Sequence, residues 1–137
     1  MQILKVAFVV LLGAVGTMSR LTEEQHKQAR IFAIECQDEL GSVVSPNFAA
    51  RMSHEMIVLT DEGDKCHVQC IFLKIGIVHP DGGVDEKGLF RELSAANTAE
   101  KAQLVTDLCV KKSGGTTRCS KAYSLYECYH QNKHKLL

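Results

Sequence analysis

Six cysteines constrain this chain more than any other feature of its 137 residues. A hydrophobic leader precedes all of them, which indicates export through an oxidising compartment where cysteines form disulfides. Each disulfide typically adds about 2–4 kcal/mol to the free energy of unfolding, a large share of the stability of an ordinary domain. We therefore expect a secreted domain held by three cross-links. The cysteines are Cys36, Cys66, Cys70, Cys109, Cys119 and Cys128.

The leader is interpreted as a signal peptide over residues 1–16. Met1–Lys5 carries one positive charge, Val6–Val15 is an apolar run of ten residues, and small residues follow where a signal peptidase cuts. A transmembrane anchor is the alternative, but the run is about half of the ~20 residues that a membrane-spanning helix needs. We expect cleavage after Gly16, or at the latest after residue 19, which leaves one domain over residues 17–137.

Charge and motifs exclude several classes of function. Removing Lys5 with the leader leaves 15 basic and 16 acidic residues, so nothing marks a nucleic-acid binder or a polybasic membrane anchor. The sequence has no Gly-x-Ser-x-Gly elbow, phosphate-binding loop or His-Glu-x-x-His motif. A small secreted phospholipase is the enzyme considered, but its adjacent cysteines and His-Asp pair are absent. We expect no catalytic residues, no nucleic-acid partner and no stable membrane insertion.

Hydrophobic periodicity is helical over nearly the whole mature chain, which predicts an all-α domain. The first helix is expected from Thr22, whose hydroxyl forms a capping box with Gln25, to Gly41. Ser45 and Pro46 signal a short second helix. The buried stripe of the first helix comprises Ala29, Phe32, Ala33, Cys36 and Leu40.

The third helix, expected from Asp61 to Ile75, has the most unusual pattern. It is apolar on two opposite sides, so it is predicted to be central and buried on both. One side holds Cys66, Cys70 and Leu73, the other holds Val68, Ile71, Phe72 and Ile75, and the interruptions are His67, Gln69 and Lys74.

Three further helices are predicted after a His-Pro-Asp-Gly-Gly turn at residues 79–83. The fourth spans residues 86–94. The fifth is expected to be capped by Asn97, with Glu100 three residues later. The sixth is expected to open near Thr117 and to run past Cys128.

Six cysteines allow fifteen connectivities, and counting does not select one. Cys66 and Cys70 lie one turn apart on one helix face, where regular backbone gives poor disulfide geometry. Each is therefore expected to reach a different partner helix. A metal site at Cys66, His67 and Cys70 is the competing interpretation, but the spacing is not a usual zinc pattern and export favours disulfides. We expect no metal and no cofactor.

These features closely resemble the six-cysteine insect odorant-binding proteins over the whole mature chain. The resemblance rests on the leader, a helical first cysteine, Cys66-x3-Cys70, and gaps of 38, nine and eight residues before Cys109, Cys119 and Cys128. The segment from Cys119 to Tyr129 is also similar to the final helix of the fly general odorant-binding subgroup. The resemblance implies six helices around an internal apolar cavity. It further implies the disulfides Cys36–Cys70, Cys66–Cys119 and Cys109–Cys128.

The function that the resemblance implies is a secreted carrier of small apolar odorants or pheromones. Such a carrier moves its ligand through the sensillar lymph to a chemoreceptor at the neuronal membrane, as a monomer or a weak homodimer. Two alternatives stay open. One is a non-olfactory carrier or scavenger of lipophilic ligands in gustatory, salivary, gut or reproductive fluid. The other, more remote, is a disulfide-rich inhibitor that acts through its surface.

Apolar residues from several helices are candidate ligand contacts in the implied cavity. The tyrosines are favoured because a buried hydroxyl needs a polar partner, which a ligand oxygen can supply, and the methionines because thioethers adapt to shape. Ordinary core packing is the alternative for each. The candidates are Met52, Met56, Phe72, Ile77, Phe90, Leu93, Leu108, Tyr123, Tyr126 and Leu137.

The tail after the last cysteine is nine residues long, too short to fill the cavity as an extra helix. Leu136 and Leu137 are expected to lie over the opening as a lid. His130 and His134 beside this lid, with His79 at the turn, suggest that protonation near pH 6 releases the ligand. Solvated histidines with no switching role are the preferred interpretation.

Overall fold

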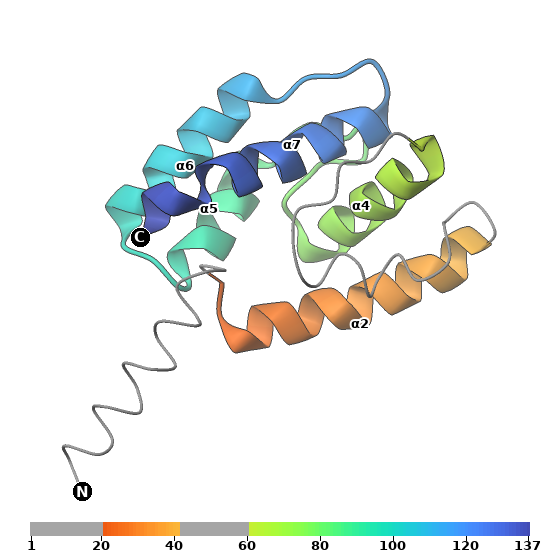
Figure 1. Ribbon diagram of the computed structural model, residues 1–137, viewed down its shortest axis with the longest axis horizontal. Coiled ribbons are helices and arrows are strands. Elements are labelled where there is room, and N and C mark those ends of the chain that lie inside the picture. Colours follow the sequence, from red (N-terminus) through yellow and green to blue (C-terminus); the bar gives the residue numbers. More distant parts are fainter. Residues whose placement is uncertain (1–20, 42–60) are drawn as a thin grey trace, which may run out of the picture.

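The computed structural model describes residues 21–41 and 61–137. Within these ranges every regular element is a helix, apart from a single bridge between Val78 and Val84, so the predicted all-α class is confirmed. None of the described helices is long and apolar enough to cross a bilayer. The leader, the short helix expected at Ser45, and the candidate contacts Met52 and Met56 lie outside the described residues. The elements are α2 (Glu23–Leu40), α4 (Glu62–Ile75), α5 (Glu86–Ser94), α6 (Ala99–Lys112), α7 (Arg118–Asn132) and the 3-10 helix η2 (Lys133–Leu136) (Figure 1).

Local capping sets the ends of these helices. Thr22 and Gln25 form the predicted capping box at the start of α2. The Gln25 N–H donates to Thr22 Oγ1 over 3.0 Å, and the Thr22 N–H donates to Gln25 Oε1 over 2.8 Å. Gly76 ends α4 in left-handed backbone at φ 91°, a conformation that glycine adopts without steric cost. The chain can therefore turn sharply from α4 towards α5.

The predicted cap of α6 is wrong by one residue. Thr98 is the cap, and its side chain accepts a hydrogen bond from the N–H of Lys101. Asn97 instead donates its side-chain amide to the Leu93 carbonyl over 2.8 Å, at the end of α5. Both residue types can cap a helix, so the choice depended on where α5 stops.

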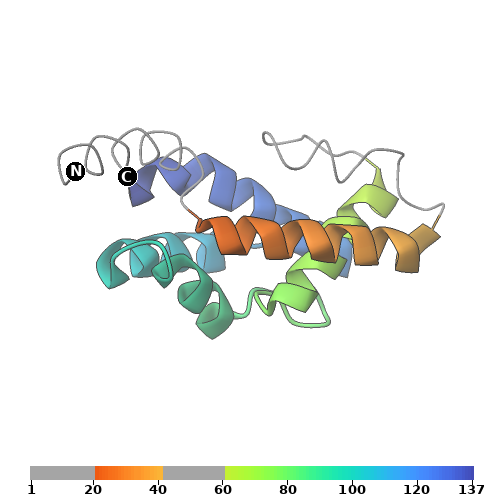
Figure 2. The ribbon, with the colours of Figure 1, turned by 90° about the horizontal axis from the view of Figure 1, so that it is seen from below.

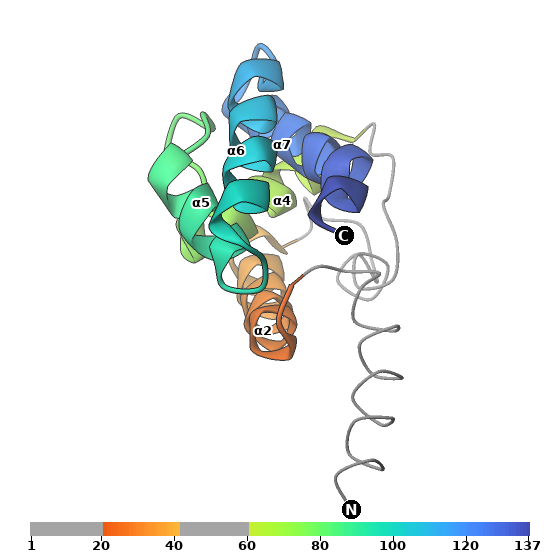
Figure 3. The same cartoon turned by 90° about the vertical axis from the view of Figure 1, so that its left-hand side faces the viewer.

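The helices form a central group with one outer layer. α7 packs along α4 and also against α6, and α5 packs on α6. α2 lies at the other edge and packs mainly on α4 (Figures 1 and 3). Seen from below, α2 crosses in front of α4 (Figure 2). The position of α2 relative to α5 and α7 is thus set chiefly through α4.

Two hydrophobic cores follow from this arrangement. The small one joins α2 to α4 through Ala33, Cys36 and Ile71. The side of α4 that holds Leu73 is buried only in part: Cys66 and Cys70 are half-buried and cross-linked as expected, but Leu73 is 41% exposed. α4 instead buries His67, whose Nε2–H donates to the Ala33 carbonyl of α2 over 2.8 Å. The large core comprises Ile77, Val78, Leu89, Leu93, Ala102, Val105, Cys109, Ala122, Leu125, Cys128 and Leu136.

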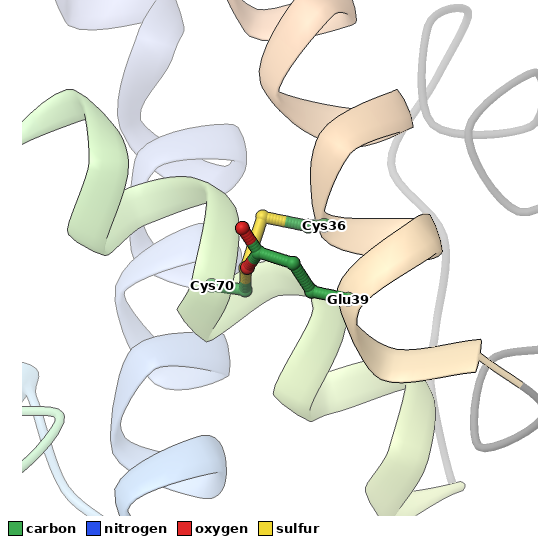
Figure 4. A group of neighbouring side chains, drawn as sticks. All are labelled: Cys36, Glu39 and Cys70. Carbon is green, nitrogen blue, oxygen red and sulfur yellow. A yellow bond between two sulfur atoms is a disulfide. The ribbon is translucent and has the colours of Figure 1, made fainter.

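Three disulfides cross-link four of the helices. Cys36–Cys70 joins α2 to α4, Cys66–Cys119 joins α4 to α7, and Cys109–Cys128 joins α6 to α7. These are the pairs that the family resemblance implies, and each α4 cysteine reaches a different helix. Figure 4 shows Cys36–Cys70 with the Glu39 carboxylate beside it. The Glu39 Oε2 lies 3.5 Å from the Cys70 sulfur, a contact without a hydrogen bond, because a disulfide sulfur carries no hydrogen.

α5 carries no cysteine, and its position is fixed by a close approach of its backbone to the end of α4. A Cβ at Gly88 of α5 would overlap the carbonyl oxygen of Gly76 and lie 2.9 Å from its carbon. Only glycine permits this approach between α5 and the end of α4.

We therefore expect Gly88→Ala to lower the free energy of unfolding by about 1–3 kcal/mol, since the added methyl group must displace backbone. In an unconstrained helix the same change would raise stability by up to about 1 kcal/mol. Urea unfolding followed by circular dichroism measures the difference. Gly114→Ala is the control, because the nearest atom to its Cβ outside the adjoining residues is the Lys112 carbonyl oxygen at 3.9 Å. Equal stability of the Gly88 variant and wild type would contradict the close approach.

Removing Cys36–Cys70 should loosen α2 selectively, because α2 packs mainly on α4. We expect the Cys36→Ala/Cys70→Ala protein to lose about 2–4 kcal/mol of stability, with the largest increase in amide hydrogen exchange along α2. The matched control is Cys109→Ala/Cys128→Ala, which removes a cross-link between α6 and α7. Similar exchange from α2 in the two double variants would count against this dependence.

Candidate ligand-binding cavity

A cavity of about 650 Å³ lies between α2, α4, α5 and α7. Its volume falls in the range of small-molecule sites, which are mostly apolar with a few polar groups. Most of its apolar wall comes from helix positions that also face one of the two cores. The apolar lining residues are Leu21, Ala29, Phe32, Ala33, Ile71, Phe72, Ile75, Ile77, Leu89, Leu93, Leu125, Tyr126 and Tyr129.

Tyr126 on α7 is the centre of an aromatic cluster along this wall. Its ring centroid lies 6.4 Å from that of Phe72 on α4 and 5.8 Å from that of Tyr123. The imidazole of His130, one turn along α7, meets the Tyr126 ring edge to face at 4.5 Å. Such geometries are favourable between aromatic rings. Phe72 and Tyr126 therefore give the wall a rigid apolar surface.

Gln25 joins the N-terminal end of α2 to α5 at the cavity wall. Its side-chain amide donates to the Glu92 carbonyl oxygen over 2.7 Å and to Glu92 Oε2 over 2.9 Å. The same residue completes the capping box with Thr22, so both ends of its amide are used. Gln25, Thr22 and Glu92 all line the cavity. One glutamine thus starts α2 and holds that start against α5.

His130 and Lys133 form the polar part of the wall at the end of α7. The Lys133 ammonium donates to Nδ1 of His130 over 3.4 Å. Burial of the ring, and to a smaller extent the Lys133 charge, lowers the pKa of His130 to about 4. His130 is therefore neutral at physiological pH and carries its hydrogen on Nε2.

Four of the ten candidate contacts line the cavity, namely Phe72, Ile77, Leu93 and Tyr126. Their contact with a ligand stays a prediction. Four other described candidates do not line it. Phe90 packs against the large core, Leu108 is half-buried on α6, Tyr123 is buried beneath the Lys65 ammonium, and Leu137 is 55% exposed.

The sequence pattern indicates some of the lining residues that are not among the candidate ligand contacts. Ala29, Phe32 and Ala33 belong to the predicted stripe of α2, and all three line the cavity. Tyr129 and His130 carried no such signal, because they belong to a segment that was interpreted as a tail. α7 continues to Asn132, in agreement with the expectation that this helix runs past Cys128.

The tail does not form the expected lid. Leu136 is 2% exposed and belongs to the large core, because η2 packs on α6 and α7. The Leu137 carbonyl accepts a hydrogen bond from the Lys101 ammonium of α6 over 2.9 Å. Neither leucine lines the cavity.

The hypothesis of a switch near pH 6 is wrong for His130, whose pKa is about 4. Burial opposes the charged imidazole at this site, and the neighbouring ammonium adds to that effect. His79 lies 3.9 Å from Asp85 at the turn, and neither His79 nor His134 lines the cavity.

Two groups of possible metal ligands occur among the described residues, and both contain a disulfide. One is Cys36, Glu39 and Cys70, and the other is Glu62, Cys66 and Cys119. In each group the two sulfurs are bonded to each other. A disulfide offers no thiolate for a metal, so these groups do not fit a zinc site.

Comparison with known proteins gives one family match and several relatives. The sequence profile of the PBP/GOBP family matches residues 18–132. Odorant-binding protein 10 of Aedes aegypti is 35% identical over 81 residues, which are 59% of this chain and 56% of the relative. The short form salivary protein D7R1 of Anopheles stephensi is 21% identical over 94 residues, 69% of this chain and 55% of the relative. The matches thus span little more than half the length of these two relatives.

Two solved structures share the fold. One is a fatty acid binding protein, OBP56a, from the oral disk of the blowfly Phormia regina. It is 29% identical, with a TM-score of 0.67 over 85% of this chain and 97% of that one. The other is the odorant-binding protein dmelOBP28a of Drosophila melanogaster. It is 20% identical, with a TM-score of 0.69 over 84% of this chain and 98% of that one.

The lowered pKa of His130 makes stability depend on pH. The unfolded imidazole binds a proton near pH 6.5 and the folded one near pH 4, so the free energy of unfolding falls as pH decreases from 6.5 towards 4. We expect His130 to account for about 2 kcal/mol of this loss, after discounting for its partial exposure. His26 and His67, whose pKa values are also lowered, act in the same direction.

Urea unfolding at pH 7 and pH 4.5 tests this dependence. His130→Phe keeps an aromatic ring and removes the titration, so its stability should change less between the two pH values than that of wild type. His134→Gln is the control, because His134 is exposed. An unchanged pH dependence in His130→Phe would contradict the assignment.

Proposed function

We propose that this chain, which belongs to the PBP/GOBP family, carries small apolar molecules in the cavity between α2, α4, α5 and α7. The family is one of odorant-binding carriers rather than enzymes. The observation that carries the proposal is a 650 Å³ space with a largely apolar wall inside a cross-linked helical frame.

The hydrophobic effect provides the binding energy for such a carrier. Each Å² of apolar ligand surface moved into the cavity contributes about 25 cal/mol, so about 250 Å² contributes roughly 6 kcal/mol before the cost of association. The aromatic and aliphatic wall imposes few directional requirements. Affinity should therefore be moderate, and ligands of similar size and polarity should compete.

The relatives support a ligand class with an apolar body and a small polar end. One is named an odorant-binding protein and one a fatty acid binding protein, so volatile alcohols, aldehydes, esters and acyl chains all come into consideration. Secretion, passage through sensillar lymph and delivery to a chemoreceptor at the neuronal membrane are part of this proposal. So is the expected state of a monomer or weak homodimer.

A carrier outside olfaction is the second candidate function. The blowfly protein comes from the oral disk, and the Anopheles relative is a salivary protein, which favours gustatory or salivary fluid as alternative locations. The same cavity would serve either role. Transcript abundance in antenna compared with mouthparts and salivary gland separates the two candidates.

Displacement of a fluorescent apolar probe tests ligand binding in this cavity. We expect Phe72→Ala and Tyr126→Ala to weaken probe binding about tenfold, because each removes a large apolar surface from the wall. Phe90→Ala is the matched control, since Phe90 packs on the large core and does not line the cavity. Equal probe affinity in all three variants and wild type would place the binding site elsewhere.

A further inference from the structure

One lysine in the cavity wall has a charge that no described carboxylate balances. Lys133 is half-buried where α7 passes into η2, and it lines the cavity. Its polar contact is with Nδ1 of His130. Within residues 21–41 and 61–137, no Asp or Glu oxygen comes within 4.0 Å of its ammonium.

The other cations of the wall are in different settings. Lys74 pairs with Glu39 at 2.9 Å and with Glu35 at 3.7 Å, so its charge is already balanced. Arg30 is exposed on α2, where water can solvate it. Lys133 is the one wall cation in the described ranges that is both half-buried and without a carboxylate partner.

His130 leaves Lys133 available as a donor. An ammonium has three N–H groups, and one of them donates to His130 Nδ1. The neutral imidazole adds no positive charge of its own, and the carbonyl end of α7 stabilises the lysine only in part. A partly desolvated cation gains most from an anionic acceptor. Two donors of Lys133 remain for it.

We propose that Lys133 binds the carboxylate of an amphipathic acid whose alkyl chain occupies the cavity, with His130 positioning the ammonium. This inference rests on the proposed carrier function and adds a ligand class and a polar subsite to it. The chain of the acid would lie along the apolar wall near Tyr126, which contacts His130. An uncharged ligand of equal length would bind the same wall without using Lys133.

Probe displacement at pH 7.5 by dodecanoic acid and by 1-dodecanol separates these two contributions. We expect Lys133→Gln to weaken binding of the acid about tenfold, which corresponds to the loss of a charge-assisted hydrogen bond. The affinity for the alcohol should change less than twofold. Lys133→Arg should retain acid binding. Lys135→Gln is the matched control, because Lys135 is exposed on η2 and does not line the cavity.

His130→Phe tests the positioning role through the same comparison of acid and alcohol affinities. The substitution should weaken binding of the acid severalfold more than binding of the alcohol, whereas loss of a residue needed only for packing would weaken binding of both equally. Equal weakening of the two ligands would contradict that role.

Several results would overturn the proposal. If Lys133→Gln weakens binding of the acid and of the alcohol equally, the lysine only supports the fold and is not part of the ligand site. If Arg30→Gln selectively weakens binding of the acid and Lys133→Gln does not, the carboxylate binds at α2. Displacement of the probe by the alcohol in either case would still support the carrier function. Failure of wild type to bind the probe, the acid or the alcohol would refute the carrier function as well.

Discussion

The disulfide between Cys36 and Cys70 is the constraint on which the cavity depends. It attaches the C-terminal part of α2 to the middle of α4, while Gln25 holds the start of α2 against α5. Apolar surfaces that face each other across an empty space tend to close, because burial of apolar area is favourable. A covalent bond and a capped helix start oppose that closure, so α2 can cover the space without filling it.

α7 faces the cavity on one side and the large core on the other. Tyr126 and His130 line the cavity, whereas Ala122 and Cys128 belong to the core, and Leu125 belongs to both. Cys119 and Cys128 anchor the helix to α4 and α6 respectively. The helix is therefore held at two points, which keeps its aromatic side chains in register with Phe72 on α4.

Much of the local structure could be predicted from particular residues. Thr22 with Gln25, Asp61 with Gly76, and Thr117 mark helix ends where the structure has them. Local hydrogen-bonding chemistry determines these positions. The Asn97 cap failed because two adjacent residues had suitable side chains and the end of α5 decided between them. The pKa of His130 depends on helix packing, which the pattern of a single segment does not contain.

The sequence by itself determined an all-helical domain, the positions of most described helices and the need for each α4 cysteine to reach a different partner. It did not determine which apolar residues face a cavity and which face a core. Both environments select the same side chains, so Phe72 and Phe90 are equivalent in the pattern. The distance between α2 and the α5–α7 group distinguishes them. That distance is a property of the tertiary structure, because it is set by contacts between residues far apart in the chain.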